Sequence, residues 1–146
     1  MEESPVGRLI LVVEDNPEHT RLIKDALDDN LGQRKIVAIA DGVQAMDFLH
    51  RRGNYADATR PDLILLDLNL PGKDGREVLA EIKAEPQLRR IPIVVFTISA
   101  TEEDIFRSYA LQGNCYVIKS SNLDQLFHIV KRIEEFWLGI VTLPGE

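Results

Sequence analysis

At 146 residues with an apolar fraction of 45%, the chain can bury one core but is too short for two ordinary domains. Its formal net charge is −7, and its 24 acidic and 17 basic residues are mixed along the chain without a basic cluster, so we expect no direct binding to nucleic acid. Because Cys115 has no second cysteine, the first residues lack a secretory-signal pattern and the apolar runs are short, we expect a cytoplasmic protein without a membrane span.

Five short aliphatic runs have the composition of buried strands, and each is followed by a segment with helical periodicity. The pattern predicts strands at 9–13, 36–40, 63–66, 91–96 and 115–118. It predicts helices at 17–28, 43–52, 76–84, 102–111 and 123–138. Most of the strands are apolar almost throughout, as is typical of parallel strands covered on both faces. Local signals agree: Asn16 before Pro17 starts one helix, Thr101 starts another and Gly113 ends it.

Right-handed connections between these elements predict an α/β fold, a doubly wound (βα)5 unit with a five-stranded parallel sheet and helices on both faces. We assign residues 8–138 to this domain, residues 1–7 to a loose N-terminus and residues 139–146 to a C-terminal tail. In such a sheet, ligands and chemistry collect at the carboxyl ends of the strands.

Polar side chains stand where four of the expected strands end. They are Glu14 and Asp15 after the first strand, Asp67 after the third, Thr97 after the fourth and Lys119 after the fifth. Each residue alone is weak evidence for a functional site, because acidic pairs often cap helices and a single Thr or Lys is usually a solvated edge residue. Their joint placement predicts one shared pocket.

Several motifs resemble the receiver domains of response regulators in two-component signalling. They are the stretch LILVVED at 9–15, the segment PDLILLDLNLPGKDG at 61–75, Thr97, and YVIK at 116–119. The resemblance covers nearly the whole chain and implies a flavodoxin-like receiver fold. It also implies that Asp67 accepts a phosphoryl group from a sensor histidine kinase and that Thr97 and Lys119 contact the phosphoryl oxygens.

The same resemblance assigns Glu14 and Asp15 as an acidic pair and has Asn69 lend its backbone carbonyl to a metal ion. Three clustered carboxylates repel one another unless a cation neutralises them, and oxygen ligands suit Mg²⁺. We therefore expect Mg²⁺ held by Asp15, Asp67 and the Asn69 carbonyl, with Glu14 acting through water.

Other functions fit the residues less well. An aspartyl-phosphate phosphatase usually carries a second Asp two positions after its nucleophile, where this chain has Asn69, which cannot deliver a proton. The chain has neither a G-x-G-x-x-G turn after its first strand nor a P-loop. We expect a phosphoacceptor protein rather than an enzyme, and the alternative is a phosphorylation-independent binding module.

Tyr116 lies three residues before Lys119, where receivers often carry an aromatic residue that changes rotamer, so Tyr116 and Thr97 are the expected switch. Lys119 is followed by Ser120 where receivers usually have proline, which leaves both a trans and a cis bond open. The three histidines fall within expected helices, away from the strand ends, and receive no role in the site: His19, His50 and His128.

The C-terminal segments 119–123 and 136–144 are similar to the small response regulators that partner cyanobacterial phytochromes. This similarity implies a phytochrome as the kinase, while the downstream protein stays unknown. The last helix and tail also carry more apolar residues than one core-facing stripe needs, which predicts a two-fold homodimer. The expected interface residues are Phe127, Phe136, Ile140, Val141 and Leu143. The alternative is a tail that folds back over its own domain.

Overall fold

The computed structural model describes residues 8–29 and 31–144, so the expected loose N-terminus at 1–7 lies outside the described residues. Strands and helices alternate as the sequence predicts. They are β1 (Leu9–Val13), α1 (Pro17–Leu27), β2 (Lys35–Ile39), α2 (Gly42–His50), β3 (Leu63–Leu66), α3 (Gly75–Ala84), β4 (Ile93–Thr97), α4 (Glu102–Ala110), β5 (Cys115–Ile118) and α5 (Leu123–Glu134), with a 3-10 turn η1 (Gly53–Tyr55) and a π-helical segment η2 (Glu135–Ile140).

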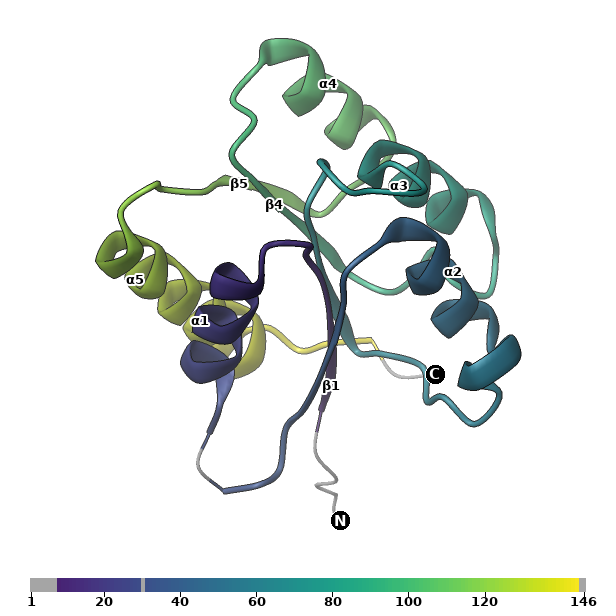
Figure 1. Ribbon diagram of the computed structural model, residues 1–146, viewed down its shortest axis with the longest axis horizontal. Coiled ribbons are helices and arrows are strands. Elements are labelled where there is room, and N and C mark those ends of the chain that lie inside the picture. Colours follow the sequence, from purple (N-terminus) through teal and green to yellow (C-terminus); the bar gives the residue numbers. More distant parts are fainter. Residues whose placement is uncertain (1–7, 30, 145–146) are drawn as a thin grey trace.

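The five strands form one parallel sheet in the order β2-β1-β3-β4-β5, which confirms the expected α/β fold. Figure 1 shows α1 and α5 on one side of the sheet and α2 and α3 on the other. The chain leaves β1 toward one edge, through β2, and returns to the other edge through β3, β4 and β5. The β1 and β3 ends are therefore the topological switch point at which doubly wound sheets place their sites.

Two hydrophobic clusters hold the helices against the sheet, one on each face. Along β1, Leu11 and Val13 pack with α2 and α3, whereas Ile10 and Val12 pack with α1 and α5. Strands β1, β3 and β4 are buried at every position, and the edge strands β2 and β5 are partly exposed. This near-continuous burial explains why the central strands read as unbroken apolar runs.

The boundaries differ from the predicted ones by two residues or more at three elements. Strand β4 begins at Ile93 rather than at 91, because Pro92 has no N–H to donate to the sheet. Helix α2 ends at His50, since Arg51 adopts the left-handed conformation. The last helix does not run unbroken to 138: the α-helical pattern stops at Glu134 and continues as η2.

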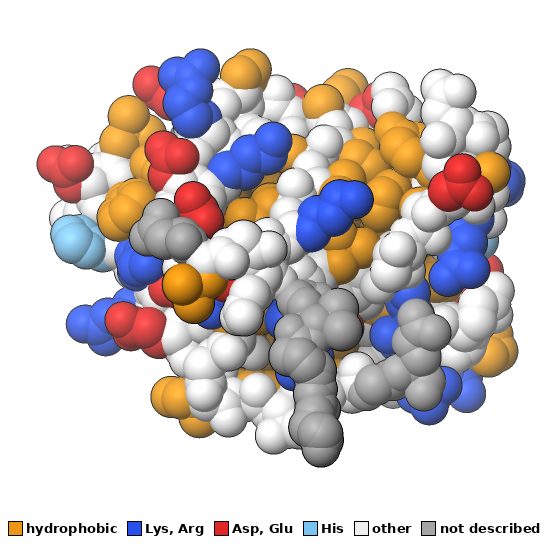
Figure 2. All heavy atoms as spheres, turned by 90° about the horizontal axis from the view of Figure 1, so that it is seen from below, with side chains coloured by type: hydrophobic (Ala, Val, Ile, Leu, Met, Phe, Trp, Pro, Cys, Tyr) orange, Lys and Arg blue, Asp and Glu red, His pale blue; other side chains and the backbone are white. Residues whose placement is uncertain are grey.

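Charged side chains of both signs cover the surface. Seen from below, at the end of the molecule where β1 begins, several Lys and Arg side chains lie beside hydrophobic ones (Figure 2). None of the helices in residues 8–29 and 31–144 has both the length and the apolar character needed to cross a membrane.

Candidate functional site

The structure brings together the polar residues that follow the strands. Glu14, Asp67, Thr97 and Lys119 are all buried at the carboxyl end of the sheet, and Asp15 is exposed beside them. Carboxylate oxygens of Glu14, Asp15 and Asp67 lie within 4.8 Å of one another. The residues that the sequence predicts to converge therefore lie together at one edge of the sheet.

Lys119 contacts several members of this cluster. Its Nζ donates to Asp67 Oδ2 at 2.9 Å and also forms an ion pair with Glu14. The ammonium lies 5.7 Å from the centre of the Phe96 ring, and the Lys119 backbone N–H donates to the Thr97 carbonyl at 2.8 Å. A buried cation thus partly neutralises two buried carboxylates, and β4 and β5 together fix where it sits.

Burial dominates the electrostatics of Glu14. Removal from water raises the pKa of its carboxyl, while the hydrogen bond and charge of Lys119 lower it and the charge of Asp67 raises it. The Asn16 backbone N–H donates to Glu14 Oε2 at 3.1 Å. Glu14 is therefore held between Lys119 and the start of α1, with burial opposing its charged form.

His19 also reaches this site, so the expectation that all three histidines lie away from the strand ends is wrong for this residue. Its Nδ1 is 3.1 Å from Lys119 Nζ. Burial is the main cause that lowers the pKa of His19, and the charge of Lys119 lowers it further. Both effects favour a neutral ring whose Nδ1 accepts a hydrogen bond from the Lys119 ammonium. The physical reason is that the first turn of α1 rises directly from the carboxyl end of β1, and His19 stands one turn after its cap.

The loop after β3 is tightly fitted around Asp67. The Asp67 backbone N–H donates to the Val13 carbonyl at 3.1 Å, and the Asn69 N–H donates to Asp67 Oδ1, also at 3.1 Å. A Cβ at Gly75 would lie 2.1 Å from the Asp67 carbonyl oxygen, so only glycine lets α3 begin this close to the loop. Asn69 itself is exposed, which leaves its carbonyl role a prediction.

The residues present fit a divalent cation. Three carboxylates, from Glu14, Asp15 and Asp67, stand against one ammonium from Lys119, which leaves a formal charge of −2 in the cluster. Clustered carboxylate oxygens are the ligands that Mg²⁺ prefers, and a dication would balance this charge.

The loop between β4 and α4 connects the site to the expected switch residue. Thr97 is completely buried at the end of β4, and its Oγ1 accepts from the Ser99 N–H at 3.4 Å. The Tyr116 hydroxyl donates to the Ser99 carbonyl at 2.8 Å. The Lys119–Ser120 bond is trans, as are all peptide bonds in the described part of the chain.

An ion pair that the sequence does not predict lies next to this loop. Arg76 at the start of α3 donates from Nε and Nη2 to the two carboxylate oxygens of Asp104 on α4, each at 2.7 Å. The Ser99 hydroxyl donates to Asp104 Oδ2 at 2.6 Å. These bonds, of which the bond from Arg76 has the largest effect, hold the pKa of Asp104 well below its usual range. The sequence offers no signal for this pair, because the partners are 28 positions apart.

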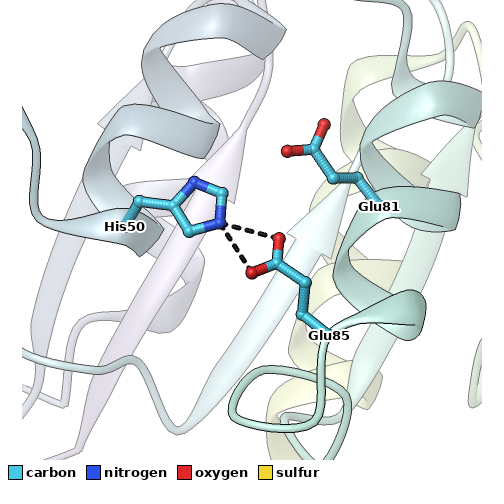
Figure 3. A group of neighbouring side chains, drawn as sticks. All are labelled: His50, Glu81 and Glu85. Carbon is cyan, nitrogen blue, oxygen red and sulfur yellow. Dashed lines mark hydrogen bonds and ion pairs between the residues drawn. The ribbon is translucent and has the colours of Figure 1, made fainter.

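A second cluster of possible ligand groups lies between α2 and α3. His50 Nε2 is 2.9 and 2.7 Å from the two carboxylate oxygens of Glu85, with Glu81 beside them (Figure 3). Each member also has another partner: Arg52 contacts His50 Nδ1 at 2.7 Å, Lys73 pairs with Glu81, and Gln87 donates to Glu85 at 3.0 Å. The cluster is therefore a set of satisfied side chains between two helices.

The expected interface residues have different environments in the single chain. Phe136 and Ile140 are 49% and 75% exposed, whereas Phe127 and Val141 are partly buried. Leu143 is only 6% exposed in the single chain. The tail folds back far enough to bury this residue, as the alternative reading holds, and leaves Phe136 and Ile140 uncovered.

Comparisons with known proteins agree with this geometry. The family model of the response regulator receiver domain matches residues 10–131. Response regulator Rcp1 of Synechocystis sp. is 51% identical over 144 residues, covering 99% of this chain and 98% of Rcp1. The phosphorylated cyanobacterial phytochrome response regulator RcpA superposes with a TM-score of 0.93 at 57% identity, covering 96% of this chain and 100% of that one. The Mn²⁺-bound form of Rcp1 superposes with a TM-score of 0.91 at 51% identity, covering 94% and 99%. The chain therefore belongs to the family of response regulator receiver domains.

Proposed function

We propose that this protein accepts a phosphoryl group from a phosphohistidine of a sensor histidine kinase onto Asp67. The observation that carries the proposal is the buried cluster in which Asp67 meets Lys119 and Glu14 at the carboxyl end of the sheet. Similarity to a regulator that was solved phosphorylated supports it. The description of RcpA as a cyanobacterial phytochrome response regulator further supports a phytochrome as the kinase.

The transfer needs alignment and charge stabilisation more than covalent chemistry from other residues. A bond forms between an Asp67 carboxylate oxygen and phosphorus while the phosphorus–nitrogen bond of the phosphohistidine breaks, and its electron pair returns to the imidazole. The Lys119 ammonium and the Asn69 N–H hold the two Asp67 oxygens, so the carboxylate is oriented before transfer. Lys119 also places a positive charge beside the incoming phosphoryl oxygens.

Asp15, Asp67 and the Asn69 carbonyl would hold Mg²⁺, with Glu14 acting through water. When bound, the ion neutralises charge between the carboxylates and the transferred phosphoryl group. Thr97 would contact a phosphoryl oxygen from the end of β4. With phosphorylation as the input, Thr97 and Tyr116 shift together and alter a surface for a partner protein.

The direct test is incubation of the purified protein with Mg²⁺ and acetyl phosphate, followed by mild intact-mass measurement. We expect the mass of one added phosphoryl group, and no addition when Mg²⁺ is omitted. Absence of the added mass in both samples would favour the phosphorylation-independent binding module.

Replacing Asp15 tests the metal assignment. We expect Asp15→Asn to weaken Mg²⁺ binding by about 10- to 100-fold, because one anionic ligand becomes neutral. Isothermal titration of Mg²⁺ into both proteins measures the effect. Asp25→Asn, an exposed residue on α1 with the same change of charge, is the matched control and should bind Mg²⁺ as wild type does. An unchanged affinity in Asp15→Asn would remove Asp15 from the site.

The proposal extends to a homodimer formed through the uncovered residues of α5, η2 and the tail. We expect Ile140→Glu to weaken self-association by about tenfold or more, since burying an isoleucine side chain is worth about 1.5–3 kcal/mol. Sedimentation velocity at increasing concentration measures the dimer. Truncation after Glu135 should have the same effect, but it also removes the buried Leu143, so the point variant is the cleaner test.

Leu31→Ser is the control for this experiment, because Leu31 is an exposed apolar residue in the segment before β2. It should associate as wild type does. A wild-type protein that stays monomeric at tens of micromolar, or equal association of wild type and Ile140→Glu, would rule out this interface.

A further inference from the structure

A pocket of about 410 Å³ lies at the opposite end of the sheet from Asp67. Its walls come from the end of α2, from the segment that leads into β3 and from the segment that leads into β4. Phe48, Leu49 and Leu88 contribute apolar surface to it, and Arg51, Arg60 and Arg90 contribute positive charge. These three segments belong to the packed domain, so the pocket is preformed.

The charge of this pocket is uncompensated within the described residues. Its lining includes three arginines and no Asp or Glu, although the chain as a whole carries a net charge of −7. In residues 8–29 and 31–144, the side chains of Arg51, Arg60 and Arg90 make no hydrogen bond or ion pair. Arg60 is also partly buried, where an unpaired charge is more costly than at an open surface.

Two acidic residues near the ends of α2 and α3 already have partners. Asp47 pairs with Arg52 at 3.3 Å, and Glu85 pairs with His50 at 2.7 Å. His50 also lines the pocket, and both of its ring nitrogens are engaged (Figure 3 shows the bonds to Glu85). The lining therefore contains no carboxylate that would neutralise the three arginines.

Arg51 is also the residue that ends α2. Its backbone has φ 57° and ψ 46°, the left-handed conformation that glycine adopts most easily and that a Cβ disfavours. Its N–H still donates to the Phe48 carbonyl at 3.2 Å. The chain thus keeps an arginine in a strained backbone position, at a point where its side chain lines the pocket.

We propose that this pocket binds a phosphate ester of nucleotide size. Arginine presents a planar set of donors that match phosphate oxygens, and three unpaired guanidinium groups suit a dianion with three such oxygens. The volume falls within the range of small-ligand pockets, and the apolar residues provide a surface for the rest of the ligand. A volume of about 410 Å³ matches one small ligand, so we take a phosphate ester as the occupant rather than an acidic protein segment.

The test uses AMP as the probe and records amide shifts of the full chain by NMR in metal-free Tris chloride buffer. Omitting metal keeps the probe from being drawn to the Asp67 cluster through a bound cation. We expect saturable shifts confined to residues 48–51, 59–60 and 87–90, with a Kd below about 1 mM. Adenosine and inorganic phosphate, titrated separately, should each bind about tenfold more weakly, because each offers only part of the contacts.

Arg60→Gln and Arg90→Gln should each weaken AMP binding by about tenfold, the loss of one charge-assisted contact. Neither side chain has a partner in the described chain, so both variants should fold normally. Arg89→Gln is the matched control, since Arg89 is adjacent and exposed but does not line the pocket, and it should bind AMP within about twofold of wild type.

Three results would overturn the proposal. The first is the absence of AMP shifts at these residues. The second is inorganic phosphate binding as tightly as AMP, which would make the pocket a site for free phosphate. The third is an Asp- and Glu-rich peptide that shifts these amides when AMP does not, which would assign the surface to an acidic segment of a partner protein.

Discussion

The Asp67→Asn variant is expected to gain no phosphoryl mass from acetyl phosphate under conditions that modify the wild-type protein. A carboxamide is a far weaker nucleophile than a carboxylate, and Asp67 is the carboxylate that Lys119 and the Asn69 N–H both orient. The loss should therefore be complete rather than partial. Intact-mass measurement before and after incubation gives the result directly.

The fold of this variant should be nearly unaffected. Asparagine has the same shape, and relief of the repulsion between Asp67 and Glu14 offsets the weakened bond to Lys119, which keeps its ion pair with Glu14. We expect a free energy of unfolding within about 1 kcal/mol of wild type. Asp57→Asn, an exposed residue in a loop, is the control and should be phosphorylated normally. Phosphorylation of Asp67→Asn at the wild-type rate would place the acceptor elsewhere.

The sequence predicts that these residues lie together because they share a position in the fold. Glu14, Asp67 and Lys119 each follow a strand and Thr97 is the last residue of one, and parallel strands end at one edge of a sheet. The aliphatic runs predict the strands for a similar reason, since both faces of β1, β3 and β4 are covered by helices.

Side-chain contacts between elements are what the sequence cannot supply. The Arg76–Asp104 pair joins two helix starts that have no fixed spacing, and the reach of His19 to Lys119 depends on how α1 leaves β1. Likewise, Arg51 and Arg90 are 39 positions apart and form no basic run, although the fold places both in one pocket. Residue types and periodicity do not determine which of these side chains come close together in space.

Asp104→Asn is expected to destabilise the protein by about 2–3 kcal/mol at pH 7. The change removes the charge from an acceptor that is bound by Arg76 through two bonds of 2.7 Å and by the Ser99 hydroxyl at 2.6 Å. Asp104 is buried, so solvent replaces little of what is lost, and the other bonds of Arg76, to Asp74 and to the Leu68 carbonyl, are longer. Urea unfolding of both proteins measures the difference.

The exposed pair Arg132–Glu135 provides a matched control on α5 and η2. Its atoms are 3.9 Å apart, and its side chains are 85% and 63% exposed. Glu135→Gln should therefore change the free energy of unfolding by less than about 0.5 kcal/mol. An equal cost for both substitutions would mean that the burial of Asp104 contributes nothing.

The difference between wild type and Asp104→Asn should also depend on pH. Arg76 chiefly, and Ser99 next, hold the pKa of Asp104 below its usual range, so the folded state binds a proton less readily than the unfolded chain does. The contribution of the carboxylate is then fully present above the unfolded pKa of about 3.9 and is lost as pH falls toward the lower folded value. Unfolding measured at pH 7, 5 and 3 should give a constant difference at the first two values and a smaller one at the third.

The same pair should govern how the β4–α4 loop responds to phosphorylation. Asp104 binds the Ser99 hydroxyl while Tyr116 binds the Ser99 carbonyl, so the resting position of Tyr116 depends on a loop that Arg76 helps to hold. In Asp104→Asn we expect the resting NMR spectrum around Tyr116 to shift toward the spectrum that beryllofluoride, a phosphoryl mimic, induces in wild type. Arg76→Gln should produce the same shift, and the double variant should add little to either single change. If the variants lose stability but the spectrum around Tyr116 is unaltered, the Arg76–Asp104 pair stabilises the fold and does not influence the position of Tyr116.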